Sequence, residues 1–259
     1  MRSGAGPAAG ARARNLEVVP YAGDTTPGVN LDVRFATASD KLTKADQALL
    51  DTLAKALKTA DLAKDRFAVA GHDRGGRCAY RMALDHADRV TRLAVLDIIP
   101  TGEAFGRTDK AFAMGYWHWF FLAQPAPLPE RLIGADPDWF WRWHTNRVPR
   151  EFFDPAALED YLTCFRNPET VRAICEDYRA AATIDCEHDA ADKQAGRRIR
   201  CPVLALWGAQ AKLEAWYDTL AVWREWADDV RGRALPCGHY LPEEVPAETL
   251  AELTAFFSG

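Results

Sequence analysis

The chain has 259 residues, of which 32 are Lys or Arg and 37 are Asp or Glu, giving a net charge of −5 and an isoelectric point near 5.7. With 48% hydrophobic residues, this composition is typical of a globular domain that needs no disulfide or metal for stability, and it excludes a disordered chain. A mildly acidic chain presents no broad basic face to a phosphate backbone. We therefore expect a small-molecule partner and no nucleic acid.

The cysteines and the N-terminus indicate the compartment. The chain contains no CxxC pair, so its six cysteines are predicted to be buried thiols in a reducing environment. No stretch reaches the ~18 apolar residues of a membrane span, and the start, MRSGAGPAAGARAR, lacks the apolar segment of a signal peptide. Its Arg- and Ala-rich composition resembles an organelle transit segment only weakly. We predict a cytoplasmic protein that does not contact a membrane.

Short apolar runs alternate with helical patterns along the chain. Residues 43–62 have apolar side chains at helical spacing, and residues 77–88 continue a helix directly after a strand-like run. This alternation predicts an α/β fold with a mostly parallel sheet. The runs that predict strands are residues 16–22, 31–37, 67–71, 93–100 and 203–208.

The composition changes in the middle of the chain. Residues 101–188 are crowded with Trp, Phe, Tyr and Pro, and they predict a helical cap inserted into the α/β frame. Residues 41–100 and 189–259 then form the core, and residues 1–40 form an atypical N-terminal segment that is partly disordered.

The strongest motif is Gly71-His72-Asp73-Arg74-Gly75, at the switch from a strand to a helix. It has the form of a nucleophile elbow with Asp in place of Ser. Gly71 and Gly75 would let the backbone turn sharply and raise Asp73 above the carboxyl ends of the strands, where α/β enzymes build their sites. The alternative is that Asp73 only caps the helix.

An elbow hydrolase also needs an acid and then a histidine, in that order along the chain. Asp97 ends the apolar run that follows the elbow, and His239 lies in a loop near the C-terminus. A carboxylate at the end of a strand can orient an imidazole and stabilise its charged form. The ordered set Asp73, Asp97 and His239 therefore predicts a catalytic triad, although each residue alone could be structural.

An aspartate nucleophile predicts attack on a saturated carbon, followed by hydrolysis of the resulting ester by water that His239 activates. Cleavage of a carbon–halogen bond or of an epoxide fits this chemistry. Arg74 and Arg77 could bind a substrate carboxylate through charge-assisted hydrogen bonds, which favours a small anionic substrate. They could equally be solvated helix residues.

Together these residues resemble the fluoroacetate (haloacetate) dehalogenases of the α/β-hydrolase fold family. The matching strings AGHDRGGRCAYRMALDHADRV, LAVLDIIPT, YWHWFFLAQPAPLPE, CEDYRA, LALWGA and CGHYLPEE extend from about Lys64 to the C-terminus. The resemblance implies conversion of fluoroacetate or chloroacetate to glycolate and halide through an ester on Asp73. Arg74 and Arg77 would bind the carboxylate. The halide would be held by His118, Trp119 and Tyr178. The resemblance also implies a homodimer without metal or organic cofactor.

The N-terminal region departs from this family. The family's HG-containing loop, which supplies a backbone N–H near the nucleophile, has no counterpart, since no HG dipeptide occurs before Gly71. We therefore expect incomplete N-terminal strands and slow hydrolysis of the ester. Two alternatives follow. One is an epoxide hydrolase, in which Tyr116, Tyr161 or Tyr178 would protonate the epoxide oxygen, and the other is a truncated, inactive family member.

Overall fold

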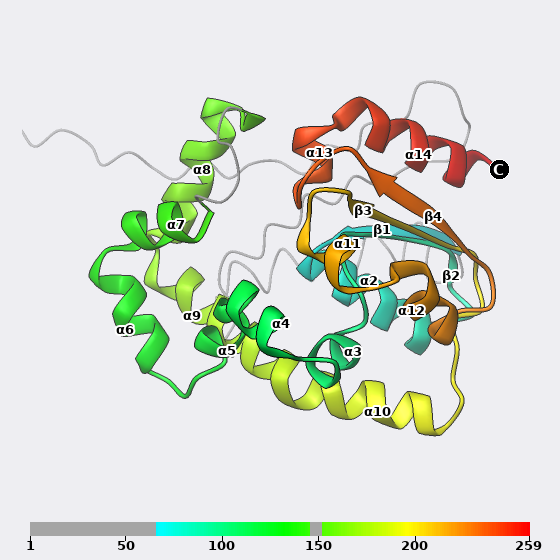
Figure 1. The fold of residues 1–259 in the computed structure, drawn as a ribbon, viewed down its shortest axis with the longest axis horizontal. Coiled ribbons are helices and arrows are strands. Elements are labelled where there is room, and N and C mark those ends of the chain that lie inside the picture. The colour runs from blue at the N-terminus through cyan, green and yellow to red at the C-terminus, as the bar shows by residue number, and fades with distance from the viewer. Residues whose placement is uncertain (1–65, 146–151) are drawn as a thin grey trace, which may run out of the picture. The chain divides into compact units, whose positions relative to one another are not determined.

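A parallel four-stranded sheet organises the described part of the chain (Figure 1). The computed structural model describes residues 66–145 and 152–259, which all belong to one unit of the chain, Thr37–Gly259. The described strands, in the order in which they pair, are β1 (Phe67–His72), β2 (Val90–Leu96), β3 (Val203–Gly208) and β4 (Val230–Leu235).

The sequence predicted three of these strands. Residues 203–208 match β3, which is buried along its whole length, as its uninterrupted apolar run indicates. The prediction at 67–71 is also confirmed. The prediction at 93–100 is wrong at both ends, because β2 begins at Val90 and ends at Leu96. The predicted strands at 16–22 and 31–37 and the predicted helix at 43–62 lie outside the described residues.

Strand β4 was not among the predicted strands, because Arg231 and Arg233 interrupt its apolar residues. Burial alternates along this strand, and in the described sheet it pairs with β3 alone. An edge strand of this kind exposes every second side chain, so it lacks the continuous apolar run that identified β3.

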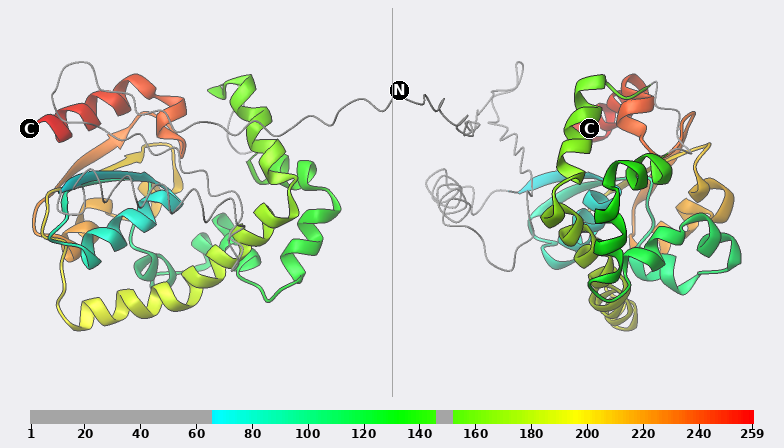
Figure 2. Two further views of the ribbon diagram at one scale, coloured as in Figure 1. Left: turned by 180° about the vertical axis from the view of Figure 1, so that it is seen from behind. Right: turned by 90° about the vertical axis from the view of Figure 1, so that its left-hand side faces the viewer.

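Helices cover both faces of the sheet (Figures 1 and 2). The helices that follow these strands are α2 (Arg74–Asp85), α11 (Lys212–Trp216), α12 (Thr219–Trp226), α13 (Leu241–Glu244) and α14 (Pro246–Ser258). One face packs against α2 and α12, through side chains that include Tyr80, Trp223 and Trp226. The other face packs against α13 and α14, through Leu241 and Phe256.

The described residues between β2 and β3 form a series of helices joined by loops. Two indole N–H groups connect it to the core, since Trp223 donates to the carbonyl of Ile98 at 3.0 Å and Trp226 donates to Glu103 at 3.1 Å. Its elements are α3 (Thr101–Gly106), α4 (Lys110–Gly115), α5 (Trp117–Leu122), α6 (Leu128–Ala135), α7 (Pro137–Thr145), α8 (Pro155–Phe165), α9 (Pro168–Ala180), the π-helix η3 (Ala181–Asp185) and α10 (Cys186–Gln194). The division into core and cap stays a prediction.

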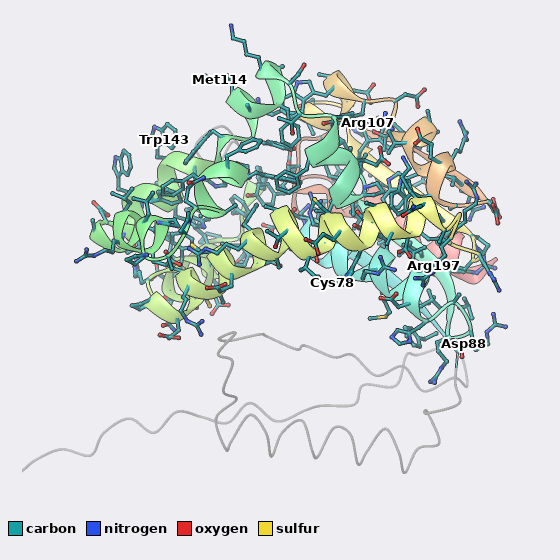
Figure 3. All side chains as sticks on the ribbon, turned by 90° about the horizontal axis from the view of Figure 1, so that it is seen from below. Cys78, Asp88, Arg107, Met114, Trp143 and Arg197 are labelled. Carbon is teal, nitrogen blue, oxygen red and sulfur yellow. The ribbon has the colours of Figure 1, made fainter. Side chains whose placement is uncertain are left out.

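A π-helical turn follows one of the predicted site residues. The residues at the junctions of α9, η3 and α10 keep right-handed helical backbone angles, so the three elements form one continuous helix. Tyr178 lies in the last turn of α9, just before η3. Wider turns of this kind occur often at functional sites. Seen from below, α10 runs alongside α3 (Figure 3).

The cysteines are free thiols, but they are not all buried. Cys78 and Cys164 are exposed, which contradicts the prediction for these two, whereas Cys175 and Cys237 are buried. Among the described residues, no helix has both the length and the apolar character that a membrane span requires.

Candidate active site

The backbone at Asp73 has the strained geometry of a nucleophile elbow. Asp73 lies between β1 and α2 with φ of 46° and ψ of −117°, a region that non-glycine residues rarely adopt. Its N–H donates to the carbonyl of Leu96 at 3.2 Å, which ties the turn to β2. The carboxylate makes no capping hydrogen bond to α2, so the interpretation of Asp73 as only a helix cap is wrong.

Two glycines make room for this turn, and they are not the predicted pair. A side-chain carbon added at Gly71 would lie 2.3 Å from the carbonyl oxygen of Gly75, closer than real contacts allow. One added at Gly76 would lie 2.9 Å from the carbonyl oxygen of Gly71. At Gly75 an added carbon would meet nothing within 4 Å, so the predicted steric role of Gly75 is wrong. The close packing of β1 on α2 depends on Gly71 and Gly76.

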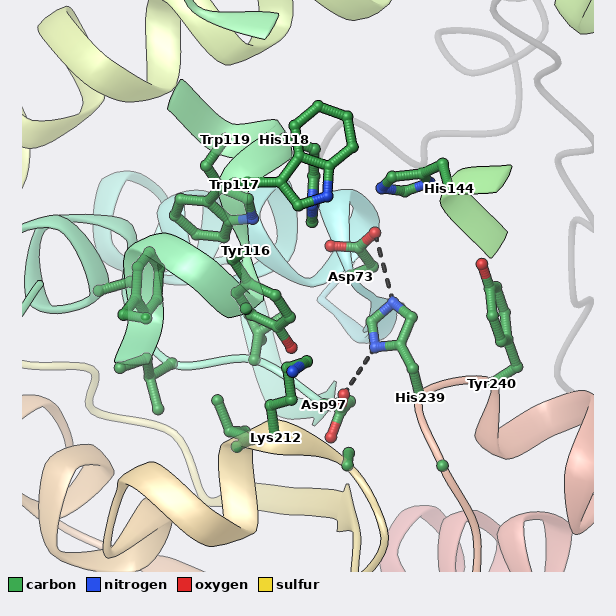
Figure 4. A pocket seen from close by; sticks show the side chains of 18 of the residues that line it. Asp73, Asp97, Tyr116, Trp117, His118, Trp119, His144, Lys212, His239 and Tyr240 are labelled. Atoms are coloured by element: carbon green, nitrogen blue, oxygen red, sulfur yellow. Dashed lines mark hydrogen bonds and ion pairs between the residues drawn. The ribbon is translucent and has the colours of Figure 1, made fainter. Parts of the chain in front are cut away.

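Asp97 and His239 extend a chain of contacts from Asp73 (Figure 4). Asp97 follows the end of β2 with φ of 53°, and only 3% of it is exposed. One of its carboxylate oxygens accepts from the N–H of Gly208 at 3.1 Å, and the other lies 2.6 Å from Nδ1 of His239. Nε2 of His239 lies 3.5 Å from Oδ2 of Asp73. The structure thus brings the three predicted residues together.

Glu244, which the sequence analysis missed, holds the loop that carries His239. Its carboxylate accepts from the N–H of Gly238 at 2.7 Å and from the N–H of Tyr240 at 2.8 Å, on the two sides of His239. The side chain of His72 also contacts this loop, with Nε2 2.7 Å from the carbonyl oxygen of His239. The acidic pair in CGHYLPEE was the available signal, because a carboxylate can bind backbone N–H groups that point toward it.

The electrostatics of the three residues are coupled. Burial alone would lower the pKa of His239, but the adjacent carboxylates of Asp73 and Asp97 outweigh this effect and raise it to about 10. Burial alone would raise the pKa of Asp73, but His239 and Arg77 lower it far below its usual range. In the unliganded protein at neutral pH, an imidazolium therefore lies between two carboxylates.

A cavity of about 280 Å³ opens above Asp73. The predicted residues Arg77, His118, Trp119 and Tyr178 line it together with the triad. Arg74 is not among its lining residues. Lining residues that the sequence analysis did not select include Trp117, Trp143, His144, Lys212, Tyr217, Tyr240 and Glu244. Trp143 lines the cavity and is also 47% exposed, so it reaches the surface of the described part of the chain (Figure 3).

The two candidate arginines differ in their partners. Arg77 is 8% exposed, donates to the hydroxyl of Thr101 at 3.1 Å, and stacks 4.3 Å from the ring centroid of Trp119. Arg74 instead forms an ion pair with Asp177, donates to its carbonyl oxygen at 3.1 Å, and lies 4.7 Å from the ring centroid of Tyr178. In this structure Arg77 alone of the pair reaches the cavity.

The three predicted halide-binding residues form one wall. The ring centroid of Tyr178 lies 5.9 Å from that of His118 and 6.1 Å from that of Trp119. Burial, reinforced by the neighbouring His144, lowers the pKa of His118 to about 3, so its ring is neutral at neutral pH. A neutral imidazole keeps one N–H donor. The wall therefore offers an imidazole, an indole and a phenol that can all donate to an anion. Within the described residues, no cluster of His, Cys, Asp and Glu is arranged to hold a metal.

Comparison with known proteins identifies the family. A sequence model described as the alpha/beta hydrolase fold matches residues 28–246 of this chain. The chain therefore belongs to the alpha/beta hydrolase fold family, and the predicted fold class is confirmed.

Individual relatives indicate which members of this family the chain is similar to. The chain is 43% identical over 197 residues to a fluoroacetate dehalogenase from Burkholderia sp., and the match covers 75% of this chain and 64% of that protein. This match confirms the predicted resemblance. A soluble epoxide hydrolase from Corynebacterium sp. (strain C12) is 28% identical, over 93% of this chain and 84% of its own. A crystal structure from Nostoc sp. PCC 7120, provisionally described as an alpha/beta hydrolase, superimposes with a TM-score of 0.74 at 48% identity, covering 82% of this chain and 71% of its own.

The glycine geometry predicts opposite effects of two substitutions. Gly71→Ala forces a methyl group into the backbone of the turn and should lower the free energy of unfolding by ~1–3 kcal/mol. Gly75→Ala adds its methyl group to open space inside a helix, and should raise the free energy of unfolding by up to about 1 kcal/mol. Urea unfolding of the two variants measures the difference, and equal effects would contradict the assignment.

The raised pKa of His239 predicts a pH-dependent stability. The pKa of histidine is 6.5 in the unfolded chain and about 10 for His239 in the folded protein. The charged imidazole therefore contributes its full stabilisation below pH 6.5, and this contribution is lost as the pH rises to about 10. The free energy of unfolding should therefore decrease across this range, by at most about 1.4 kcal/mol per pH unit. Urea titrations at several pH values measure this slope. His239→Asn should flatten it, and an unchanged slope in that variant would assign the effect to another group.

Proposed function

We propose that the protein hydrolyses a small 2-haloacid, such as fluoroacetate or chloroacetate, to glycolate and halide. The observation that carries this proposal is the placement of Asp73, His239 and Asp97 on the wall of a cavity that also contains the guanidinium of Arg77. The similarity to a fluoroacetate dehalogenase supports the same substrate class.

In the first step, one carboxylate oxygen of Asp73 attacks the α-carbon of the substrate. A carbon–oxygen ester bond forms, and the carbon–halogen bond breaks with its electron pair leaving on the halide. The strongly lowered pKa of Asp73 keeps the nucleophile ionised at neutral pH. Arg77 binds the substrate carboxylate, and the donors of His118, Trp119 and Tyr178 stabilise the departing halide. Fluoride is a poor leaving group, so these donors matter most for fluoroacetate.

In the second step, water attacks the carbonyl carbon of the ester, and His239 accepts its proton. The bond between the carbonyl carbon and the alkyl oxygen breaks, and the imidazolium returns its proton to that oxygen. Glycolate leaves, and the carboxyl group of Asp73 loses the remaining proton of the water and becomes a carboxylate again. The pKa near 10 in the unliganded protein makes His239 a poor base. Ester formation removes the negative charge of Asp73, one of the two carboxylates that raise this pKa. The first step thus lowers the pKa of His239 and prepares it as the base for the second.

The relative of the epoxide-hydrolase type and the cavity tyrosines support a second candidate. Tyr116 and Tyr178 line the cavity, and burial raises the pKa of both phenols, so each stays protonated and able to donate to an epoxide oxygen. Tyr161 is not among the lining residues and donates to Glu243 at 3.0 Å. The buried guanidinium of Arg77 favours an anionic substrate over a neutral epoxide.

Four further predictions concern the N-terminal region, the oligomeric state and the cellular location. The HG-type loop would lie in the N-terminal region, outside the described residues, so the expected slow ester hydrolysis stays a prediction. The truncated, inactive alternative depends on the same region. A homodimer and a cytoplasmic location also stay predictions.

Substitution of the triad tests the two-step route. Asp73→Asn removes the nucleophile, so halide release from chloroacetate should fall at least 10³-fold. His239→Asn removes the base for the second step alone, so one halide is released per protein and the ester persists. An ion-selective electrode measures the halide, and intact-mass spectrometry detects the carboxymethyl group added to Asp73. Sustained turnover in either variant contradicts the route, and diol formation from styrene oxide without halide release favours the epoxide hydrolase.

Matched substitutions of the two arginines test how the carboxylate is bound. Arg77→Met removes a charge-assisted donor inside the cavity, so kcat/KM for chloroacetate should fall about 10–100-fold. Arg74→Met breaks the pair with Asp177 outside the cavity, so the decrease should be less than about tenfold. Steady-state halide release measures both. A larger loss in the Arg74 variant would mean that Arg74 leaves Asp177 to bind the substrate.

A further inference from the structure

The cavity is larger than the proposed two-carbon substrates require. Its volume is about 280 Å³, whereas a haloacetate occupies roughly 90 Å³ if each of three water-sized groups takes about 30 Å³. A substrate with a longer carbon chain would fill more of this space. The side chains that line the remaining volume therefore bear on which acids the site accepts.

Lys212 is a second cation that lines this cavity (Figure 4). It is the first residue of α11, which follows β3, and it is half-buried. Its ammonium group lies 5.3 Å from the ring centroid of Trp216, and a carbon added at Gly115 would lie 3.1 Å from Nζ. The side chain is thus held between α4 and the Trp216 ring.

The two cations approach the nucleophile from different strands. Arg77 belongs to α2, which follows β1, and Lys212 follows β3, with β2 between them. The strands that precede these two residues are two strand spacings apart, which corresponds to about 10 Å between their backbones. A dicarboxylate of four or five carbons carries a carboxylate at each end, so it can meet two cations that enter the cavity from separate elements. Asp73, which follows β1, and Asp97, which follows β2, lie within the same cavity.

We propose that the site accepts 2-halo dicarboxylates, with the carboxylate next to the halogen on Arg77 and the distal carboxylate on Lys212. This inference rests on the proposed dehalogenation. Asp97 and Glu244 line the cavity, so a second substrate carboxylate would be repelled without a nearby cation. The ammonium of Lys212 offsets this repulsion and gives the distal group a charge-assisted donor.

A 2-halo dicarboxylate would react by the same two steps as fluoroacetate or chloroacetate. For 2-chlorosuccinate, Asp73 displaces chloride from the second carbon and forms an ester, and water cleaves the ester at its carbonyl carbon. The products are 2-hydroxysuccinate, chloride and one proton. No oxidant, reductant or further reactant is consumed.

Three substrates and four proteins test this inference. Chloride release is measured from chloroacetate, 2-chlorobutyrate and 2-chlorosuccinate, of which the last two have the same chain length but differ in the distal charge. The wild-type protein should prefer 2-chlorosuccinate to 2-chlorobutyrate by at least tenfold in kcat/KM. Lys212→Met should reduce this preference at least tenfold, and Lys212→Arg should restore most of it. Lys110→Met is the matched control, because Lys110 is exposed and is not among the cavity residues.

The outcomes separate this inference from the proposed function. Turnover of chloroacetate without turnover of 2-chlorosuccinate overturns the inference but not the proposed function. The same holds if Lys212→Met leaves the preference for 2-chlorosuccinate over 2-chlorobutyrate unchanged. If no substrate is turned over, the increase in Tm caused by succinate or butyrate tests the distal site, because a ligand that binds the folded state raises Tm. A larger Tm increase with succinate than with butyrate, lost in Lys212→Met, supports the distal site. Equal increases overturn it.

Discussion

The position of one imidazole between two carboxylates is the interaction on which the rest of the site depends. Asp73, Asp97 and His239 come from the ends of β1 and β2 and from the loop after β4, and their side chains meet within hydrogen-bonding or ion-pairing distance. Both aspartates have positive φ, so the backbone is strained at the two points where the carboxylates leave the sheet. Strain of this kind persists only where surrounding packing enforces it. Here the close contact of β1 with α2 and the hydrogen bonds between adjacent strands supply that packing.

The same interaction links the two chemical steps that we propose. An imidazolium paired with two carboxylates is stable but cannot accept a proton. Conversion of one carboxylate to an ester changes the charge of the site without moving any element of the fold. Because the substrate itself neutralises Asp73, the protonated His239 would lose its proton and become a base without a conformational change of the protein. Glu244 keeps the His239 loop in place by binding backbone N–H groups on both sides of the histidine.

Charge and aromatic surface divide the cavity into regions of different chemistry. His118, Trp119 and Tyr178 present neutral donors, which suit a small anion that forms during the reaction. Arg77 and Lys212 present a guanidinium and an ammonium group, which suit substrate groups that are anionic throughout the reaction. Burial raises the pKa of the phenol of Tyr178 and lowers that of the imidazole of His118, so both stay neutral where we propose that the halide forms. These differences in environment, and not residue type alone, indicate a role for each group.

The order of motifs along the chain was enough to predict Asp73, Asp97 and His239, because an elbow, a strand end and a late loop have fixed places in this fold family. Sequence spacing could not show which of Arg74 and Arg77 reaches the cavity. The two are three residues apart and share a helix face, yet Asp177, on a distant helix, holds Arg74 outside the cavity. Sequence spacing likewise did not predict Lys212 as a cavity residue, because its position depends on how α11 packs against α4.

The sequence by itself determined the fold class, the existence of three of the described strands and the three residues Asp73, Asp97 and His239 that meet in the structure, because hydrophobic runs, glycine-rich turns and the order of motifs can be read along the chain. Only the tertiary structure decided that Gly76 rather than Gly75 closes the elbow, that β4 completes the described sheet, and that Glu244 holds the His239 loop. Each of these features depends on contacts between elements whose local patterns are unremarkable, so no single stretch of sequence contains the signal. Burial, charge pairing and the shape of the cavity arise when those elements pack together.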